Sequence, residues 1–184
     1  MRILFSSLGL LLIATTLSFA QPQQPPPPDL DACAFTVHGE PTRATVTGPG
    51  DIVPLVHVVE QPDSPIEVLS VDLTGMWLSV ANGELAHNNC ARYTLRNRSD
   101  RAIERTSVEL QISPGGSYGV FSPSGGTSLA PGGTTEIKAC NGGGHASGVH
   151  GDRVRLLVSV RSVEFENCTY LPSLRIPRSL GVHP

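Results

Sequence analysis

The cysteine thiols and histidine imidazoles are the side chains in this sequence best suited to binding a metal. Cys140 is followed by His145 and His150, and His87 lies further upstream. A thiolate with two imidazoles is a donor set that holds copper, and a weak axial ligand completes the coordination. The residues between Cys140 and His145 include three glycines, however, which is also the composition of a solvated hairpin loop. We prefer the loop interpretation and keep copper binding by these four residues as the alternative.

A candidate nucleophile lies further upstream. Residues 115–119 read Gly-Gly-Ser-Tyr-Gly and place Ser117 in a G-x-S-x-G pattern. That pattern activates a serine where a strand precedes it and a helix follows, whereas the residues after Ser117 are rich in turn formers. The sequence also lacks an H-E-x-x-H motif, a Walker loop and a dinucleotide fingerprint. We therefore expect no catalytic residue, no enzymatic activity and no cofactor.

The elements that would carry these residues are predicted to be strands. In residues 90–96, Ala91, Tyr93 and Leu95 fall on one face and polar residues on the other. The same period of two recurs in residues 108–112, 135–139 and 154–160. This alternation is typical of antiparallel strands that bury one face, and no segment after residue 20 carries a sustained helical repeat. The sequence predicts an all-β protein, with residues 81–89 as the one segment that could form a turn of helix.

The alternation changes phase at two places. Ile66 is out of step with Val71, and Val160 is out of step with Val163. One extra residue in a strand has this effect, so we expect β-bulges or a change of sheet there. Turn-forming residues predict connectors at 97–100, 114–116, 123–126, 131–133 and 141–144. Seven to nine short strands at this spacing indicate a two-layer β-sandwich.

A family resemblance agrees with this architecture. Residues 93–103 read Tyr-Thr-Leu-Arg-Asn-Arg-Ser-Asp-Arg-Ala-Ile, and they are followed by a strand at 108–110 and by Ser-Leu-Ala-Pro-Gly-Gly at 128–133. This resembles the immunoglobulin-like modules of exported bacterial proteins, in which a strand ends in Asn-x-Ser and a Leu-x-Pro-Gly turn begins a later one. The resemblance covers about residues 88–165. It implies an immunoglobulin-like antiparallel β-sandwich and no particular activity.

Four cysteines follow residue 20, namely Cys33, Cys90, Cys140 and Cys168. In an exported chain this even number predicts two disulfides, and three connectivities are compatible with the sequence. The immunoglobulin-like resemblance implies one of them. It places the strand that ends at Asn97 antiparallel beside the strand that follows the Leu-x-Pro-Gly turn, which pairs Cys90 with Cys140 and leaves Cys33 for Cys168.

A second resemblance concerns the copper alternative. The segment from Cys140 to His150, taken with His87, is similar in outline to the copper loop of cupredoxins, which are also exported β-sandwich proteins. The resemblance implies copper held by the Cys140 thiolate and imidazoles. The match departs from the family because His150 stands where methionine is expected and Met76, the one methionine after residue 20, is distant in sequence. Our prediction is therefore that the protein has no metal site.

The N-terminus predicts export. Arg2 precedes a largely apolar stretch, and Ser18 and Ala20 are small residues at the −3 and −1 positions of a cleavage site, so residues 1–20 are expected to be a cleavable signal peptide. The stretch is shorter than the roughly 20 apolar residues that cross a bilayer, and no membrane span is expected after cleavage. The predicted organisation continues with a Pro/Gln-rich linker at 21–30, a β-sandwich domain at 31–170 and a C-terminal tail at 171–184.

The net charge of the chain argues against nucleic-acid binding. The 184 residues carry a formal net charge of −3, which does not supply the basic surface that nucleic-acid binding needs. Lys138 is the one lysine among 13 basic residues, and we expect the arginines on outward-facing strand positions. The sequence predicts a secreted or periplasmic, non-catalytic β-sandwich protein. Its role is expected to be binding, adhesion or structure at the cell envelope, with an unidentified protein or envelope component as partner.

The signal-peptide prediction has a direct test. We expect the exported chain to begin at Gln21, because signal peptidase cuts after the small residue at −1. Intact-mass measurement of the protein isolated from the native host checks this. A mass that retains residues 1–20, or that carries a lipid on Cys33, would contradict it.

Overall fold

The computed structural model describes residues 33–113, 116–121, 128–147 and 154–174. The predicted signal peptide and linker lie outside these residues. The described residues form strands and loops with a short 3-10 helix, η2 (Val53–Leu55), and contain no α-helix, so the all-β prediction is confirmed. No helix in these ranges is both long and apolar enough to cross a membrane.

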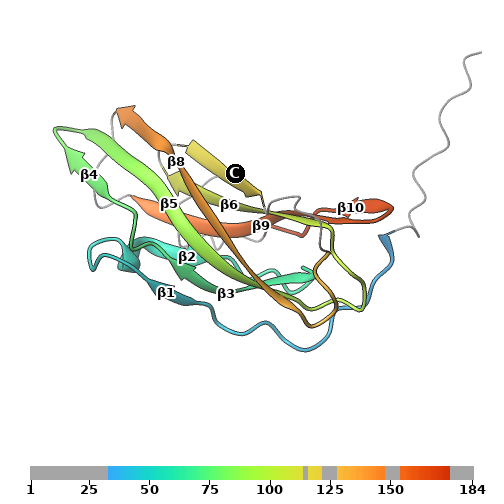
Figure 1. Cartoon of the computed structure of the whole chain (residues 1–184). Coiled ribbons are helices and arrows are strands. Elements are labelled where there is room, and N and C mark those ends of the chain that lie inside the picture. Colours follow the sequence, from blue (N-terminus) through green and yellow to red (C-terminus); the bar gives the residue numbers. More distant parts are fainter. Residues whose placement is uncertain (1–32, 114–115, 122–127, 148–153, 175–184) are drawn as a thin grey trace, which may run out of the picture.

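The first sheet is organised around one long strand, β5 (Glu84–Asn97). An antiparallel partner, β8 (Thr134–Ser147), runs beside it along nearly its whole length (Figure 1). The other edge of β5 is shared by two antiparallel strands, β4 (Leu78–Ala81) and β3 (Ile66–Asp72). A short parallel strand, β1 (Thr45–Thr47), pairs with β3 at the outer edge.

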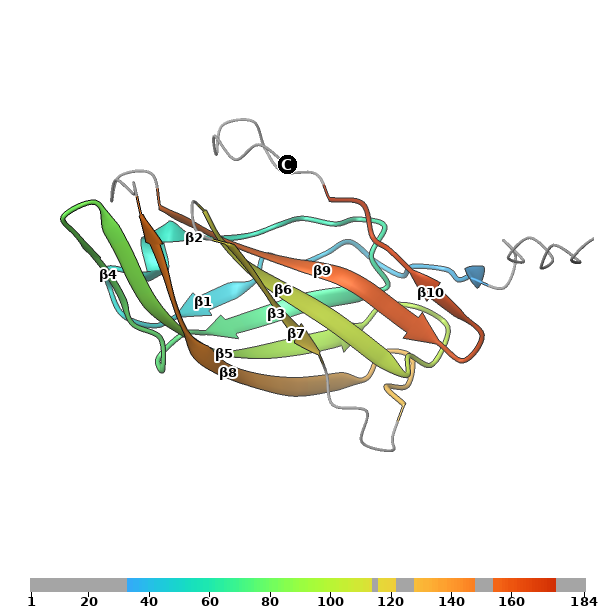
Figure 2. The same ribbon diagram turned by 90° about the horizontal axis from the view of Figure 1, so that it is seen from above.

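The second sheet has β9 (Arg155–Phe165) and β6 (Arg105–Ser113) as its central antiparallel pair (Figure 2). The outer edge of β6 pairs with β7 (Gly116–Phe121). The outer edge of β9 is shared by β10 (Cys168–Tyr170), which is antiparallel, and β2 (Val56–Val58), which is parallel. The described residues thus contain ten strands, which is more than the seven to nine that the sequence predicts. The strands β1, β2 and β10 have three residues each, which is too short for an alternating pattern to be recognised in the sequence.

The two sheets contribute to one hydrophobic core. Val71, Tyr93 and Leu95 from the first sheet and Leu110 and Val158 from the second are fully buried in the same cluster. The buried face of β5 is therefore the one that the alternation in residues 90–96 predicts. This arrangement of two sheets over a shared core is consistent with the predicted β-sandwich.

Both predicted phase breaks are irregularities of strand pairing. The register between β3 and β5 shifts between Val68 and Ser70. Between β6 and β9, Val108 pairs with Val160 whereas the preceding Ser107 pairs with Ser162. Each shift leaves one extra residue in a strand, which is the bulge that the sequence predicts.

Two local predictions were wrong. Residues 81–89 do not form a helical turn, because Asn82 and Gly83, with φ of 53° and 77°, make the tight turn of the β4–β5 hairpin. Asn-Gly is a strong hairpin signal, since both central residues of such a turn need positive φ. Residues 141–144 are not a connector, because β8 continues to Ser147 against the first half of β5. The predicted turn at 131–133 is present, and Gly132 has φ of 72°.

The edge of β9 between β2 and β10 is completed by a side chain. Gln61 Nε2 donates to the Val160 carbonyl at 2.9 Å, and Gln61 Oε1 accepts from the Val160 amide at 2.8 Å. These two bonds reproduce one rung of a strand ladder. Beyond β10, the carboxylate of Asp63 accepts from the Tyr170 hydroxyl and from both the amide and the hydroxyl of Ser173, which fixes the described part of the predicted C-terminal tail.

The rung made by Gln61 predicts a cost for its removal. We expect Gln61→Ala to lower the free energy of unfolding by about 1–3 kcal/mol, because both polar groups of the buried Val160 backbone lose their partner. Denaturant unfolding measures the change. Gln111→Ala, on β6, is the matched control and should cost clearly less. Equal losses in the two variants would show that the rung does not stabilise the edge of β9.

Candidate functional site

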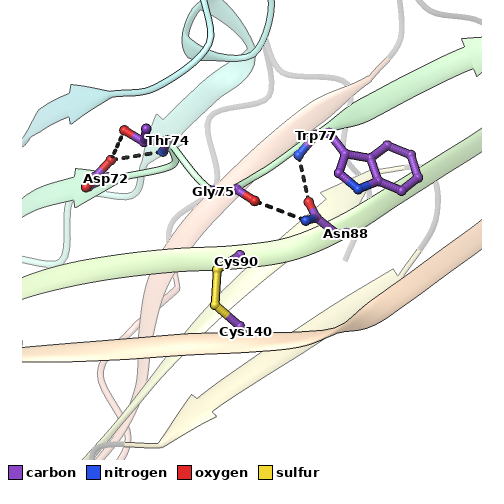
Figure 3. The surroundings of a disulfide bond; sticks show 7 residues. All are labelled: Asp72, Thr74, Gly75, Trp77, Asn88, Cys90 and Cys140. Atoms are coloured by element: carbon purple, nitrogen blue, oxygen red, sulfur yellow. Dashed lines mark hydrogen bonds between the residues drawn. A yellow bond between two sulfur atoms is a disulfide. The ribbon is translucent and has the colours of Figure 1, made fainter.

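The residues of the copper alternative do not form a common site in the described part of the chain. Cys140 is bonded to Cys90 (Figure 3), and Cys33 is bonded to Cys168. These are the two pairs that the immunoglobulin-like resemblance implies. Because its sulfur is in a disulfide, Cys140 is not the thiolate that copper coordination requires.

The histidines are also separated. His87 is buried and pairs with Gly144 across the sheet, whereas His145 pairs with Ala86 and is exposed. Neighbouring residues of a strand point to opposite faces, so the two imidazoles lie on different sides of the sheet. Burial is the main cause that lowers the pKa of His87. Within the described ranges no three His, Cys, Asp or Glu side chains form a group that could hold a metal, and His150 lies outside them.

Ser117 lies in β7, where it pairs with Gln111 of β6. The G-x-S-x-G pattern requires a sharp turn between a strand and a helix to expose the serine. A position within a paired strand does not provide that geometry.

The Cys90–Cys140 disulfide is covered on one side by the loop between β3 and β4 (Figure 3). A Cβ on Gly75 of this loop would lie 3.0 Å from the Cys90 sulfur, so a larger residue there would require the loop or the disulfide to shift slightly. The Asn88 side chain fixes the loop, since it accepts from the Trp77 amide at 2.6 Å and donates to the Gly75 carbonyl at 3.0 Å. The disulfide therefore cross-links the two longest strands, β5 and β8, and the loop packs over it.

A different part of the molecule has the shape of a binding site. A cavity of about 460 Å³ lies where β1 and β3 of the first sheet approach β2 and β9 of the second. We call it the β1–β2 cavity. Both sheets contribute to its walls, which combine apolar side chains such as those of Val46 and Val58 with polar and charged ones such as those of His57, Glu60 and Gln61. Small-molecule sites have this order of volume.

Glu67 is the first of two buried charged residues that line the cavity. Its Oε1 accepts from the amide and the hydroxyl of Thr42, and its Oε2 accepts from Nε and Nη2 of Arg96 at 2.9 and 2.5 Å. Burial by itself would raise the pKa of Glu67, but the hydrogen bonds from Thr42 and Arg96 together lower it below its ordinary value. Glu67 is therefore a carboxylate whose charge is offset by Arg96.

Arg98 is the second charged residue, and only 6% of its surface is exposed. Its Nε donates to the His38 carbonyl and its Nη2 to the Gly39 carbonyl. Nη1 is buried and has no hydrogen-bond partner. None of the ion pairs found among the described residues involves Arg98. The expectation that the arginines lie on outward-facing strand positions is wrong for this residue, because it follows the end of β5 and turns inward.

The turn after β5 determines where Arg98 lies. The Asn97 side chain donates to the carbonyls of Arg101 and Leu129, at 2.7 and 2.9 Å, and accepts from the amide and the hydroxyl of Ser99. The Arg98 backbone is fixed in turn, since its amide donates to the Pro65 carbonyl at 2.7 Å. The Asn97 side chain thus uses all of its hydrogen-bonding groups within this turn and its neighbours. The turn places Arg98 among the residues that line the cavity.

Comparisons of this chain with protein-family models, with curated proteins and with solved structures give no significant match.

The Glu67 contacts predict a pH-dependent stability. At neutral pH we expect Glu67→Gln to cost about 1–3 kcal/mol, because the buried, charge-assisted bonds are lost. The folded pKa lies below the ordinary value of 4.5, so the contribution of the carboxylate is present above that pH and is lost as the pH falls through the folded pKa. The difference between wild type and variant should therefore shrink on acidification below pH 4.5.

Urea unfolding from neutral pH to about pH 3 measures this difference. Glu136→Gln is the matched control, because Glu136 pairs with Arg92 at the exposed surface and such pairs contribute at most about 1 kcal/mol. A stability difference for Glu67→Gln that does not change with pH would contradict the assignment of Glu67 as a buried carboxylate.

Proposed function

We propose that the protein is an exported, non-catalytic β-sandwich protein that binds a small ligand at the cell envelope, and that the β1–β2 cavity is its ligand site. The observation that carries the proposal is the cavity itself, which is about 460 Å³ in volume and is lined by apolar and polar residues from both sheets. This volume lies within the range of sites that bind small molecules.

Two further observations support the compartment and the fold. Disulfides persist mainly in oxidising environments, and the two in this protein agree with export to the periplasm or the exterior. The backbone of Asn97 exchanges hydrogen bonds with Gly132 and Gly133, which joins the Asn-x-Ser and Leu-x-Pro-Gly sequences as in the immunoglobulin-like modules that the chain resembles. These contacts support, within the proposal, an immunoglobulin-like sandwich.

The other candidate functions fit the structure less well. Copper binding would require reduction of the Cys90–Cys140 disulfide before Cys140 could act as a ligand. A purely adhesive or structural role does not account for the cavity between the two sheets, whereas ligand binding does.

A retention experiment tests the proposal. The exported protein is dialysed against a small-molecule extract of the native envelope, and the retained compounds are identified by mass spectrometry. Ala44→Phe places an aromatic ring at a residue that lines the cavity. Ala130→Phe, the matched control, makes the same change at an exposed position in a turn.

We expect wild type and Ala130→Phe to retain the same compound and Ala44→Phe to lose it, because the added ring occupies the ligand volume. Circular dichroism and the unfolding midpoint establish that both variants are folded. Retention of the same compounds by all three proteins would place binding outside the cavity. Retention of none by wild type would contradict a small-molecule function.

A further inference from the structure

We propose that the Cys90–Cys140 disulfide is a redox-active site that exchanges with a dithiol reductant, and that the thiolate of the reductant attacks the Cys140 sulfur. Cys90 falls on the face of β5 opposite the buried Ala91 and Tyr93, so the site lies on the outer face of the first sheet. Neither cysteine lines the β1–β2 cavity. The inference therefore goes beyond the proposed ligand binding and does not depend on it.

The two disulfides differ in their accessibility. Cys140 is exposed, and among the described residues that form or contact the hydrophobic core neither Cys90 nor Cys140 is found. Cys33 and Cys168 are both half-buried, and Cys168 packs against the core. Thiol–disulfide exchange requires access of a thiolate to a sulfur atom, and exposed disulfides are commonly the labile or regulatory ones. A reductant should therefore reach the Cys90–Cys140 bond first.

The strand arrangement determines which sulfur is open to attack. A thiolate displaces the leaving sulfur in line with the S–S bond, so the rate depends on access behind the attacked sulfur. Figure 3 shows this bond spanning from β5 to β8. The loop between β3 and β4 packs against the Cys90 sulfur at Gly75. In the described part of the chain β8 pairs only with β5 and lies at the edge of the sheet, so the approach to Cys140 is the open one.

Lys138 provides a positive charge near the attacked sulfur. It is exposed and lies two residues before Cys140 on β8, which places both side chains on the same face. The acidic residues Glu136 and Asp72 interact with Arg92, whereas Lys138 takes part in none of the ion pairs found among the described residues. Its charge attracts the incoming thiolate and stabilises the Cys140 thiolate that is released later.

The exchange takes place in two balanced steps. The first thiolate of the reductant forms a bond to Cys140 Sγ while the S–S bond breaks, and Cys90 leaves as a thiolate that takes up a proton. The second thiol of the reductant loses its proton and attacks the reductant's own sulfur in the mixed disulfide, which releases Cys140. Two electrons and two protons thus pass from the reductant to the protein, and the reductant becomes a disulfide.

The first sheet should remain folded during the exchange. Cys90 and Cys140 are directly opposite residues of an antiparallel pair, and the neighbouring residues on both sides of them are also paired between β5 and β8. This pairing is made by the backbone and does not need the S–S bond. The disulfide can therefore open and close in the folded protein.

Limited reduction of the folded, exported protein tests the proposal. Dithiothreitol is the dithiol probe, N-ethylmaleimide blocks the free thiols at successive times, and mass spectrometry maps the modified peptides. We expect Cys90 and Cys140 to be modified on the order of tenfold faster than Cys33 and Cys168, because their bond is the more accessible one. Circular dichroism should show an unchanged strand signal at that stage.

A monothiol identifies the attacked sulfur. After brief treatment with glutathione and blocking with N-ethylmaleimide, we expect glutathione on Cys140 and N-ethylmaleimide on Cys90. In Lys138→Gln the reaction should slow by about twofold to fivefold, which is the effect of one exposed charge. The matched control is Arg161→Gln, because Arg161 is an exposed arginine on β9, and it should react as fast as wild type.

Each contrary result overturns a stated part of the inference. Equal rates for the two disulfides, or reduction only in denaturant, would show that Cys90–Cys140 is a purely structural cross-link. Loss of the strand signal on selective reduction would show the same. Glutathione found mainly on Cys90 would overturn the approach from the edge of β8. An unchanged rate in Lys138→Gln would overturn the role of Lys138.

Discussion

The side-chain amide of Asn97 is the interaction on which the geometry of the candidate site depends. All of its hydrogen-bonding groups are used inside the protein, on the carbonyls of Arg101 and Leu129 and on Ser99. The amide therefore fixes the turn after the longest strand of the first sheet. Because Arg98 is the next residue, its direction follows from that turn, and its backbone amide is held by Pro65. The position of the buried guanidinium is therefore determined by the fold of the backbone on either side of it.

The same region contains two buried charges with different surroundings. Glu67 is satisfied by Thr42 and by a two-bond contact with Arg96, so it ties the segment before β1 to the sheet. Arg98 is satisfied only in part, because one of its nitrogens has no partner. Buried polar groups are usually bonded, and among the described residues the Tyr93 hydroxyl also lacks a partner. The bonds from Arg98 to the His38 and Gly39 carbonyls tie the segment before β1 to the turn after β5. Both buried charges therefore hold that segment beside the cavity.

Much of the fold could be predicted from the sequence, whereas the candidate site could not. Alternation in residues 90–96 identified the buried face of β5, and the phase changes located both bulges, because period-two patterns report directly which side of a strand is buried. Residues 141–144 were missed because glycine pairs through its backbone and leaves no side-chain pattern. Arg98 and Glu67 were missed for another reason. Their burial depends on chain segments distant in sequence, around Thr42 and Gly39, which no local pattern reveals.

A crystal structure of the exported protein with the compound retained from the envelope extract would test the central claim most directly. The account predicts that the compound lies in the β1–β2 cavity, in contact with residues of both sheets such as Val46 of β1 and Val58 of β2. A compound bound elsewhere on the protein, with the cavity unchanged, would contradict the account.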